Sequence, residues 1–185
     1  MHVTFNASER STLGVEIEIG IVDTATRELA CVASPILSTV GADYPEGEHP
    51  RAKHELYEST IEVITGICDT VDDARRDLTA TLAELDAVMA PQGFAFEGAG
   101  LHPTARWFDL QMTEGERYQR LVDRIQWPAR RLMTHGVHFH VGVRSAEKVV
   151  AITDALSAYL PHFVALSASS PFWHGHDSGL ASVRT

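Results

Sequence analysis

Two carboxylates placed two residues apart in an apolar run are the first groups in this chain that could do chemistry. Glu16 and Glu18 alternate with Ile17 and Ile19 within the segment 13–22. This alternation predicts a strand with two unlike faces, so both carboxylates share one face about 7 Å apart. Unpartnered carboxylates this close repel each other, and a hard divalent metal is their natural counter-ion. The polar side of a solvent-facing edge strand would give the same pattern.

A third acid lies in another alternating run. Residues 61–65 are mostly β-branched, which predicts a second strand with Glu62 on the face opposite Ile61 and Val63. A lone buried charge is costly, so Glu62 either has a partner at a site or lies in water on an amphipathic sheet. Both interpretations remain open from this run alone.

Two histidines complete the candidate chemistry. In the run 136–143, alternation predicts a strand with His138 and His140 on one face and Val137, Phe139 on the other. Neutral imidazole is a good metal ligand, and side chains at this spacing converge. Zinc, magnesium with a nucleotide, or two hydrogen-bonded structural histidines all fit.

Elements between these runs must position the side chains. A polar turn at 23–27 followed by the apolar residues 28–32 predicts an antiparallel hairpin with the first strand, and 41–53 is predicted to be an exposed loop. Capping and acidic residues at 69–73 open a helix that ends before Pro91 and packs on the core. A short strand, 94–97, follows it.

The later part of the chain predicts mainly helices. Residues 113–133 form an arginine-rich helical stretch interrupted at Pro128, and most of its arginines should be solvated or paired with acids. A helix capped by Ser145 follows, and Pro161 opens another apolar segment, which runs through Ser170. The side chains of the first of these helices that are expected to face inward are Val149, Ile152, Leu156 and Tyr159.

Composition narrows the class of protein. With 185 residues, 44% of them hydrophobic and 22% charged, the chain is expected to form one domain over residues 1–185. A formal net charge of −10 argues against nucleic-acid and anionic-membrane partners. Without a basic-then-apolar leader, the expected location is the cytoplasm. Cys31 and Cys68 lack metal or redox spacing and are expected to be reduced.

Seven ordered blocks together resemble the carboxylate–amine ligases of the glutamate–cysteine ligase type 2 family. They are TLGVEIEI (12–19), HELYESTIEVITGIC (54–68), GAGLHPTARW (98–107), ERYQRL (116–121), GVHFHVG (136–142), LPHFVALSASSPFWHG (160–175) and ASVR (181–184). Family members are about twice as long, so the chain resembles their N-terminal half. Leu101 also replaces the threonine usual in its block.

The resemblance implies a fold, a reaction and its partners. The fold class is α+β and glutamine-synthetase-like: a curved antiparallel sheet with the site on one face and helices packed on the other. The implied reaction uses ATP and Mg²⁺, with Mn²⁺ as an alternative, to phosphorylate the side-chain carboxylate of L-glutamate. The amine of L-cysteine, or another amine, then attacks the acyl phosphate. A homo-oligomer or association with a complementary C-terminal half is implied as well.

Site residues carry over from the resemblance one by one. Glu16 and Glu18 match the metal-binding pair of the first strand, and Glu62 matches the acid before the Val-Ile-Thr run. Glu55 takes a further acidic position seven residues before Glu62. The implied metal ligands are Glu16, Glu18, Glu55, Glu62 and His138.

The remaining positions concern the nucleotide and substrate. His138 matches a position that contacts metal or nucleotide phosphate, with His140 beside it. Arg184 matches an arginine near the substrate, where its planar fork suits a carboxylate or phosphate. With Glu16, Glu18 and Glu62, Arg184 completes the implied catalytic group. The alternatives are a half-domain that binds metal and nucleotide without turnover and needs a partner chain, and a zinc protein built on the two histidines.

Overall fold

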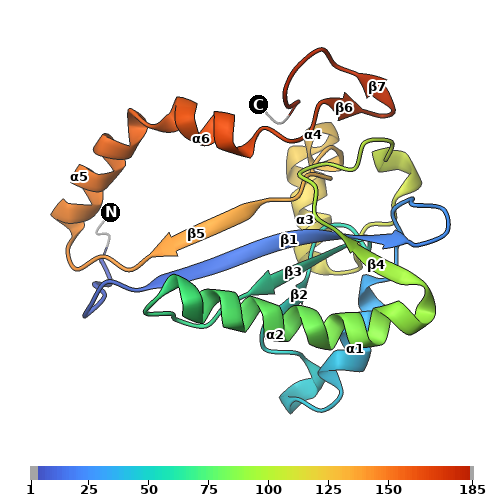
Figure 1. Cartoon of the computed structure of the whole chain (residues 1–185), viewed down its shortest axis with the longest axis horizontal. Helices are drawn as coiled ribbons and strands as arrows, with labels where there is room; N and C mark the ends of the chain where they lie inside the picture. The colour runs from blue at the N-terminus through green and yellow to red at the C-terminus, as the bar shows by residue number, and fades with distance from the viewer. Residues whose placement is uncertain (1–3, 184–185) are drawn as a thin grey trace.

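A five-stranded antiparallel sheet organises the computed structural model, which describes residues 4–183 (Figure 1). The strand order is β2-β3-β1-β4, with β5 also paired to β1. The strands are β1 (Leu13–Asp23), β2 (Ala52–His54), β3 (Thr60–Ile64), β4 (Phe94–Glu97) and β5 (Val137–Val141). The predictions of strands around Glu16, Glu62, Phe96 and His138 are thereby confirmed.

The long first strand has different neighbours along its length. One edge of β1 pairs with β3, whereas the other edge pairs with β5 over residues 13–17 and with β4 over residues 20–23. β1 is therefore central to the sheet, so its polar face is not the face of an edge strand. This excludes one of the two interpretations of its alternation.

Two helices cover one face of the sheet. α1 (Ala33–Gly41) and α2 (Val71–Met89) pack against the apolar side chains of β1 and β3. The core there includes Ile21, Ile61, Val63, Leu85 and Met89, all at most 1% exposed. The alternating apolar residues thus face the helices, as their period predicts, and the carboxylates are left on the opposite face.

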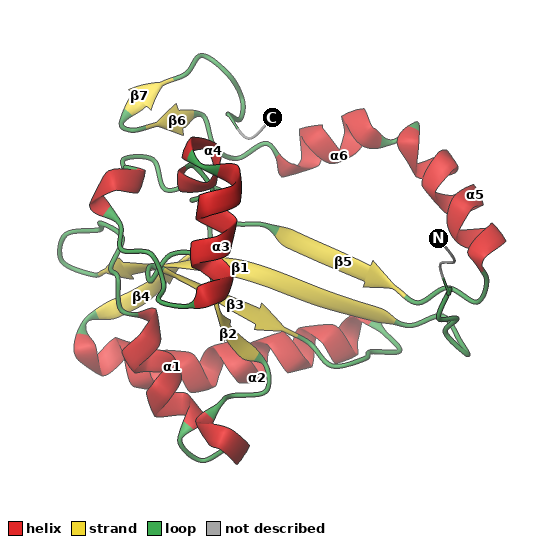
Figure 2. Ribbon diagram, turned by 180° about the vertical axis from the view of Figure 1, so that it is seen from behind, coloured by secondary structure: helices red, strands yellow, loops and turns green. Residues whose placement is uncertain are grey.

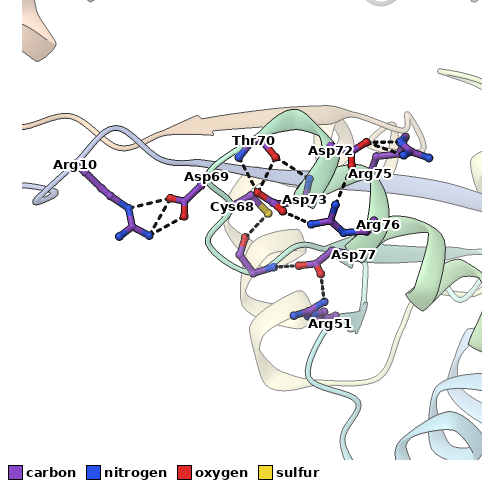
Figure 3. A network of polar contacts seen from close by, with 11 residues as sticks. Arg10, Arg51, Cys68, Asp69, Thr70, Asp72, Asp73, Arg75, Arg76 and Asp77 are labelled. Carbon is purple, nitrogen blue, oxygen red and sulfur yellow. Dashed lines mark hydrogen bonds and ion pairs between the residues drawn. The ribbon is translucent and has the colours of Figure 1, made fainter.

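Polar contacts fix where these two helices begin. α1 has no cap from its own N-cap residue; the buried carboxylate of Glu58 instead accepts hydrogen bonds from the Ser34 backbone N–H at 2.9 Å and from its hydroxyl at 2.7 Å. α2 begins with a capping box between Thr70 and Asp73. Figure 3 shows the charged network around this end, in which Asp77 joins α2 to Arg51.

A second layer lies on the other side of the sheet. α3 (Glu116–Ile125) and the short α4 (Trp127–Arg130) lie across the sheet from α2 (Figure 2). The predicted interruption occurs at Gln126, which has a φ of 61° and precedes α4, whose second residue is Pro128. A core cluster joins this layer to the loops: Leu56, Tyr57, Leu101, Ala105 and Met133.

The last helices differ from the prediction. α5 (Ala146–Ser157) and α6 (Leu160–Ser167) form an arch beside β5 (Figure 1). Within the described chain neither helix has a buried residue, and Leu156 and Tyr159 are 45% and 56% exposed. The expectation that Val149, Ile152, Leu156 and Tyr159 face inward is wrong, because no other described element covers them.

The predicted hairpin after β1 is present only as a short antiparallel turn. The chain does turn back antiparallel, but only one isolated bridge, Val22 to Leu29, forms before α1 begins. The loop 41–53 holds η1 (Pro45–Gly47) and β2; further short elements are η2 (Ala90–Gln92), η3 (Trp107–Asp109), β6 (Phe172–Trp173) and β7 (His176–Asp177). Among residues 4–183 no single helix is long and apolar enough to cross a membrane; α5 and α6 pass that test only together, bent by 66°.

Candidate active site

The predicted acids and histidines lie on the face of the sheet opposite α1 and α2. Register shows this directly, since Glu18 on β1 pairs with Glu62 on β3, and Glu16 pairs with His138 on β5. Directly opposed residues of antiparallel strands project to the same face with neighbouring Cβ atoms. Residues from three strands, far apart in sequence, are thereby brought together.

Three carboxylates form the tightest group. Glu18, Glu55 and Glu62 each offer an oxygen within 4.8 Å of the others, and all three side chains are partly buried. Glu55 lies in the loop that follows β2. Glu18 accepts a hydrogen bond from the Gly136 N–H at 2.7 Å, and none of the three carboxylates has a Lys or Arg ion-pair partner among residues 4–183. Negative charge is therefore concentrated here without a neutralising side chain.

The pKa of Glu62 reflects this concentration of negative charge. Burial is the largest cause that raises the pKa of Glu62, and together with repulsion from the adjacent Glu55 carboxylate and smaller effects from Glu16 and Glu18 it brings this pKa to about 7. A bound divalent cation would relieve this repulsion. Because every donor in the group is a carboxylate oxygen, the group fits Mg²⁺ or Mn²⁺ better than zinc, which favours nitrogen and sulfur ligands.

The two histidines form a neighbouring group around Glu16. His138 Nδ1 and His140 Nε2 lie 3.1 and 3.2 Å from the two oxygens of the Glu16 carboxylate. Burial acts to raise the pKa of Glu16, but hydrogen bonds with His140 and His138 outweigh it, so this pKa lies below its ordinary value. The predicted site is thus divided: Glu16 belongs with the histidines, and the other three acids with one another. Arg184 lies outside the described residues.

Glu97 is a further acid on this face that the sequence reasoning did not single out. It pairs with Gly20, two residues beyond Glu18, and its Oε2 is buried without a hydrogen-bond partner among the described residues. Burial raises its pKa. Gly20 leaves the required space, since a Cβ there would lie 2.8 Å from His135 Cε1 and 3.1 Å from Glu97 Oε2. The sequence does contain a signal for Glu97, because alternation in residues 94–97 places it on the face opposite to that of Phe96, which packs on the core.

A cavity of about 820 Å³ opens beside the three-carboxylate group. Glu18 and Glu55 line one side, and α3 lines the other with Tyr118, Leu121 and its arginines. The face therefore combines clustered carboxylates with space for a small-molecule substrate.

Two solved structures share this fold over most of this chain. A bifunctional glutathione synthetase from Pasteurella multocida aligns with a TM-score of 0.50 and 16% identity, over 81% of this chain and 19% of its own. A glutamate–cysteine ligase from Francisella tularensis, solved in complex with AMP, aligns with a TM-score of 0.50 and 15% identity, over 82% of this chain and 30% of its own. At this identity the likeness concerns the fold alone, and it confirms the expected α+β class.

Sequence comparison gives the family. The model of glutamate–cysteine ligase family 2 matches residues 12–185, and the chain belongs to that family. It is 50% identical to a Frankia casuarinae protein named "Putative glutamate–cysteine ligase 2-1" and 48% identical to a similarly named Thermobifida fusca protein. Each match covers all of this chain but 48% and 46% of the relative, so the chain spans about half the length of the relatives it matches.

Proposed function

We propose that this chain supplies the N-terminal half of the active site of an ATP- and Mg²⁺-dependent carboxylate–amine ligase, which joins L-glutamate to L-cysteine in the cytoplasm. The observation that carries the proposal is the oxygen-only group of Glu18, Glu55 and Glu62 on an exposed sheet face. Family membership supports the reaction class. The AMP complex of the Francisella tularensis ligase supports a nucleotide as the second ligand.

Phosphoryl transfer defines the tasks of these residues. Transfer of the γ-phosphoryl group of ATP to the glutamate side-chain carboxylate gives an acyl phosphate and ADP; attack by the cysteine amine then forms the amide and releases phosphate. Such transfer depends mainly on positioning and charge neutralisation. Bound Mg²⁺ or Mn²⁺ would supply the neutralising charge. Glu18, Glu55 and Glu62 would hold the ions on the side of the substrate carboxylate, because they form the closest carboxylate group.

The second group is assigned to the nucleotide. Glu16 orients His138 and His140 on the same face, so their imidazoles can donate to phosphate oxygens or join Glu16 in holding a metal ion. Arg184 is proposed to bind a carboxylate or phosphate of the substrates, as its fork of donors permits.

An open strand edge and exposed apolar side chains support one further part of the proposal, a complementary partner. β5 has β1 as its only neighbour among the described strands, and the outward side chains of β5 and α6 are between 51% and 84% exposed. These side chains are Val137, Phe139, Val141, Leu160, Phe163 and Leu166. An apolar surface beside an open strand edge favours association. We propose that the remaining half of the longer family proteins covers this surface, with a second copy of this chain as the alternative occupant.

Product formation tests the proposed function. The protein that carries these residues, with its second half present, is incubated with glutamate, cysteine and ATP, and mass spectrometry is expected to detect γ-glutamylcysteine. Metal analysis after dialysis is expected to show exchangeable magnesium or manganese. Nucleotide binding without product would favour the non-catalytic half-domain, and stoichiometric zinc that survives mild chelation would favour the zinc protein.

A further inference from the structure

The cavity beside the carboxylates has a positive wall to which the sequence predictions assign no function. Arg117, Arg120 and Arg124 recur on α3 at i, i+3 and i+7, so they share one helix face. All three line the cavity that Glu18 and Glu55 also line, with Asp123 as the one acid that α3 contributes to the described lining. Helix burial does not require this stripe, because α3 packs on its core cluster through Tyr118, Leu121 and Val122. Packing of α3 on its core cluster therefore does not explain why the arginines line the cavity.

Only one of the three arginines is neutralised. Arg120 pairs with Glu116 on its own helix at 3.0 Å. Among residues 4–183, Arg117 and Arg124 have no carboxylate within ion-pair distance, although a carboxylate group forms the opposite wall. Arg120 is thus paired with an acid, and Arg117 and Arg124 are exposed to solvent, as the sequence predicts, with their guanidinium groups available to a ligand.

Arg117 is also held in place. Its guanidinium lies over the aromatic ring of Tyr118, 5.5 Å from the ring centroid. The Tyr118 hydroxyl donates to the carbonyl of His54 at 2.8 Å, next to Glu55, which fixes the ring against the loop that carries the acid. The hydrogen bond between Tyr118 and His54 therefore links the helix that carries the arginines to the loop that carries Glu55. The fold thereby sets the distance between the arginines and the carboxylates.

We propose that Arg117 and Arg124 bind an oxyanion of a substrate whose other end lies at the carboxylate group. Guanidinium forks match the two oxygens of a carboxylate or phosphate. A ligand that spans the cavity would present one anionic group to the arginines and another to ions held by Glu18 and Glu55. The oxyanion is the α-carboxylate of an amino-acid substrate or a phosphate of the nucleotide. This inference rests on the proposed function for the ligand class and adds the residues that select it.

Calorimetry on the full protein distinguishes these sources. The probes are L-glutamate, Mg²⁺-ATP and inorganic pyrophosphate, and the variants are Arg117→Gln, Arg124→Gln and, to retain charge without the fork, Arg124→Lys. Loss of a charged hydrogen bond is expected to weaken binding about 10- to 100-fold. Weaker glutamate binding alone identifies the carboxylate, and weaker ATP and pyrophosphate binding identifies the phosphate. Arg75→Gln, on the exposed face of α2 across the sheet, is the control and should change nothing.

Two results separate this inference from the proposed function. If product forms but both arginine variants keep wild-type affinities and KM values, the arginine site is wrong and the ligase assignment stands. If the arginine variants weaken binding of a probe but the wild-type protein forms no product, the oxyanion site stands and the ligase assignment is wrong. A wild-type protein that binds none of the three probes would overturn the arginine site.

Discussion

Glu62 lies between a sheet core and three other carboxylates, so its charge costs the fold free energy unless a cation is bound. Glu62→Gln keeps the size of the side chain and removes this charge. We therefore expect at least about tenfold weaker Mg²⁺-ATP binding by calorimetry, with the free energy of unfolding changed by less than about 1 kcal/mol. Glu46→Gln, an exposed acid in η1, is the control. Unchanged affinity of the Glu62 variant would contradict its assignment as a ligand.

Tyr57 gives a pH dependence that is separate from the metal site. Its ring is 2% exposed, its hydroxyl donates to the Arg130 carbonyl at 2.5 Å, and burial raises its pKa to about 12 although the Arg130 guanidinium acts to lower it. In the unfolded chain a tyrosine loses its proton near pH 10, so the unfolded state binds fewer protons between pH 10 and 12 and stability falls as pH rises.

The matched variant for this effect is Tyr57→Phe. Below pH 9 we expect it to be less stable than wild type by about 1 kcal/mol, because the hydrogen bond is lost. As pH rises from 10 toward 12 the difference should close, since only the wild-type protein loses stability through this hydroxyl. Denaturant unfolding at pH 8 and pH 11 measures the difference in the free energy of unfolding between the two proteins at each pH. A gap that stays constant over this range would show that Tyr57 ionises normally in the folded protein.

How far single residues could be predicted depended on where their partners come from. The acids on β1 and β3 follow from local alternation, whereas the closeness of Glu18 to Glu62 is a matter of register between strands, which a local pattern does not contain. The same holds for the pairing of both histidines with Glu16 rather than with each other. Glu58, a member of a family block without an assigned role, caps α1 from 24 positions away.

Among the elements, α2 has the clearest sequence signals and the most complete set of end contacts. Thr70→Ala removes the side chain that accepts from the Asp73 N–H at 3.1 Å and is expected to cost about 1 kcal/mol of stability. Thr79→Ala, the same substitution on the exposed helix body, should instead stabilise by a few tenths of a kcal/mol because alanine has the higher helix propensity. Equal effects in thermal denaturation would mean that the capping box does not stabilise the helix.

Elements that were predicted wrongly share a physical cause. α5 has a capping serine and an apolar period, so the helix itself was predictable, but the period does not reveal which element it packs against. The segment after β1 turns back as a hairpin would, yet Glu58 and the start of α1 end the pairing after one bridge. The difference lies in tertiary contacts, which α5 lacks among the described residues and which end the pairing before α1, and a local pattern contains neither.

At the scale of the whole molecule, the exposed apolar side chains of β5 and α6 are expected to drive association. The 185-residue chain expressed by itself is expected to self-associate, and to form a defined complex when the second half of the protein is supplied. Phe139→Ser with Leu166→Ser should weaken either form of association, since these side chains are 74% and 84% exposed. Phe108→Ser, at a 57% exposed position in η3, is the control.

Size-exclusion chromatography with light scattering measures this outcome. A clean monomer, unaffected by the double substitution and indifferent to the second half, would show that these surfaces do not bind a partner. Product formation by that monomer at an ordinary enzyme rate, about 1–10³ per second, would show that no complementary half is required.

The two neighbours along one edge of β1 also have a consequence during synthesis. Pairing of β1 with β3 and β4 can be complete once residue 97 has been synthesised. The second edge of residues 13–17 stays unpaired until β5, which ends at Val141, has been synthesised. At about 5–20 residues per second, those further residues take about 2 to 9 s. For that time the nascent chain carries an open strand edge beside apolar side chains. Strand addition can therefore begin at β1 during translation, before the β5 edge of the finished fold has formed.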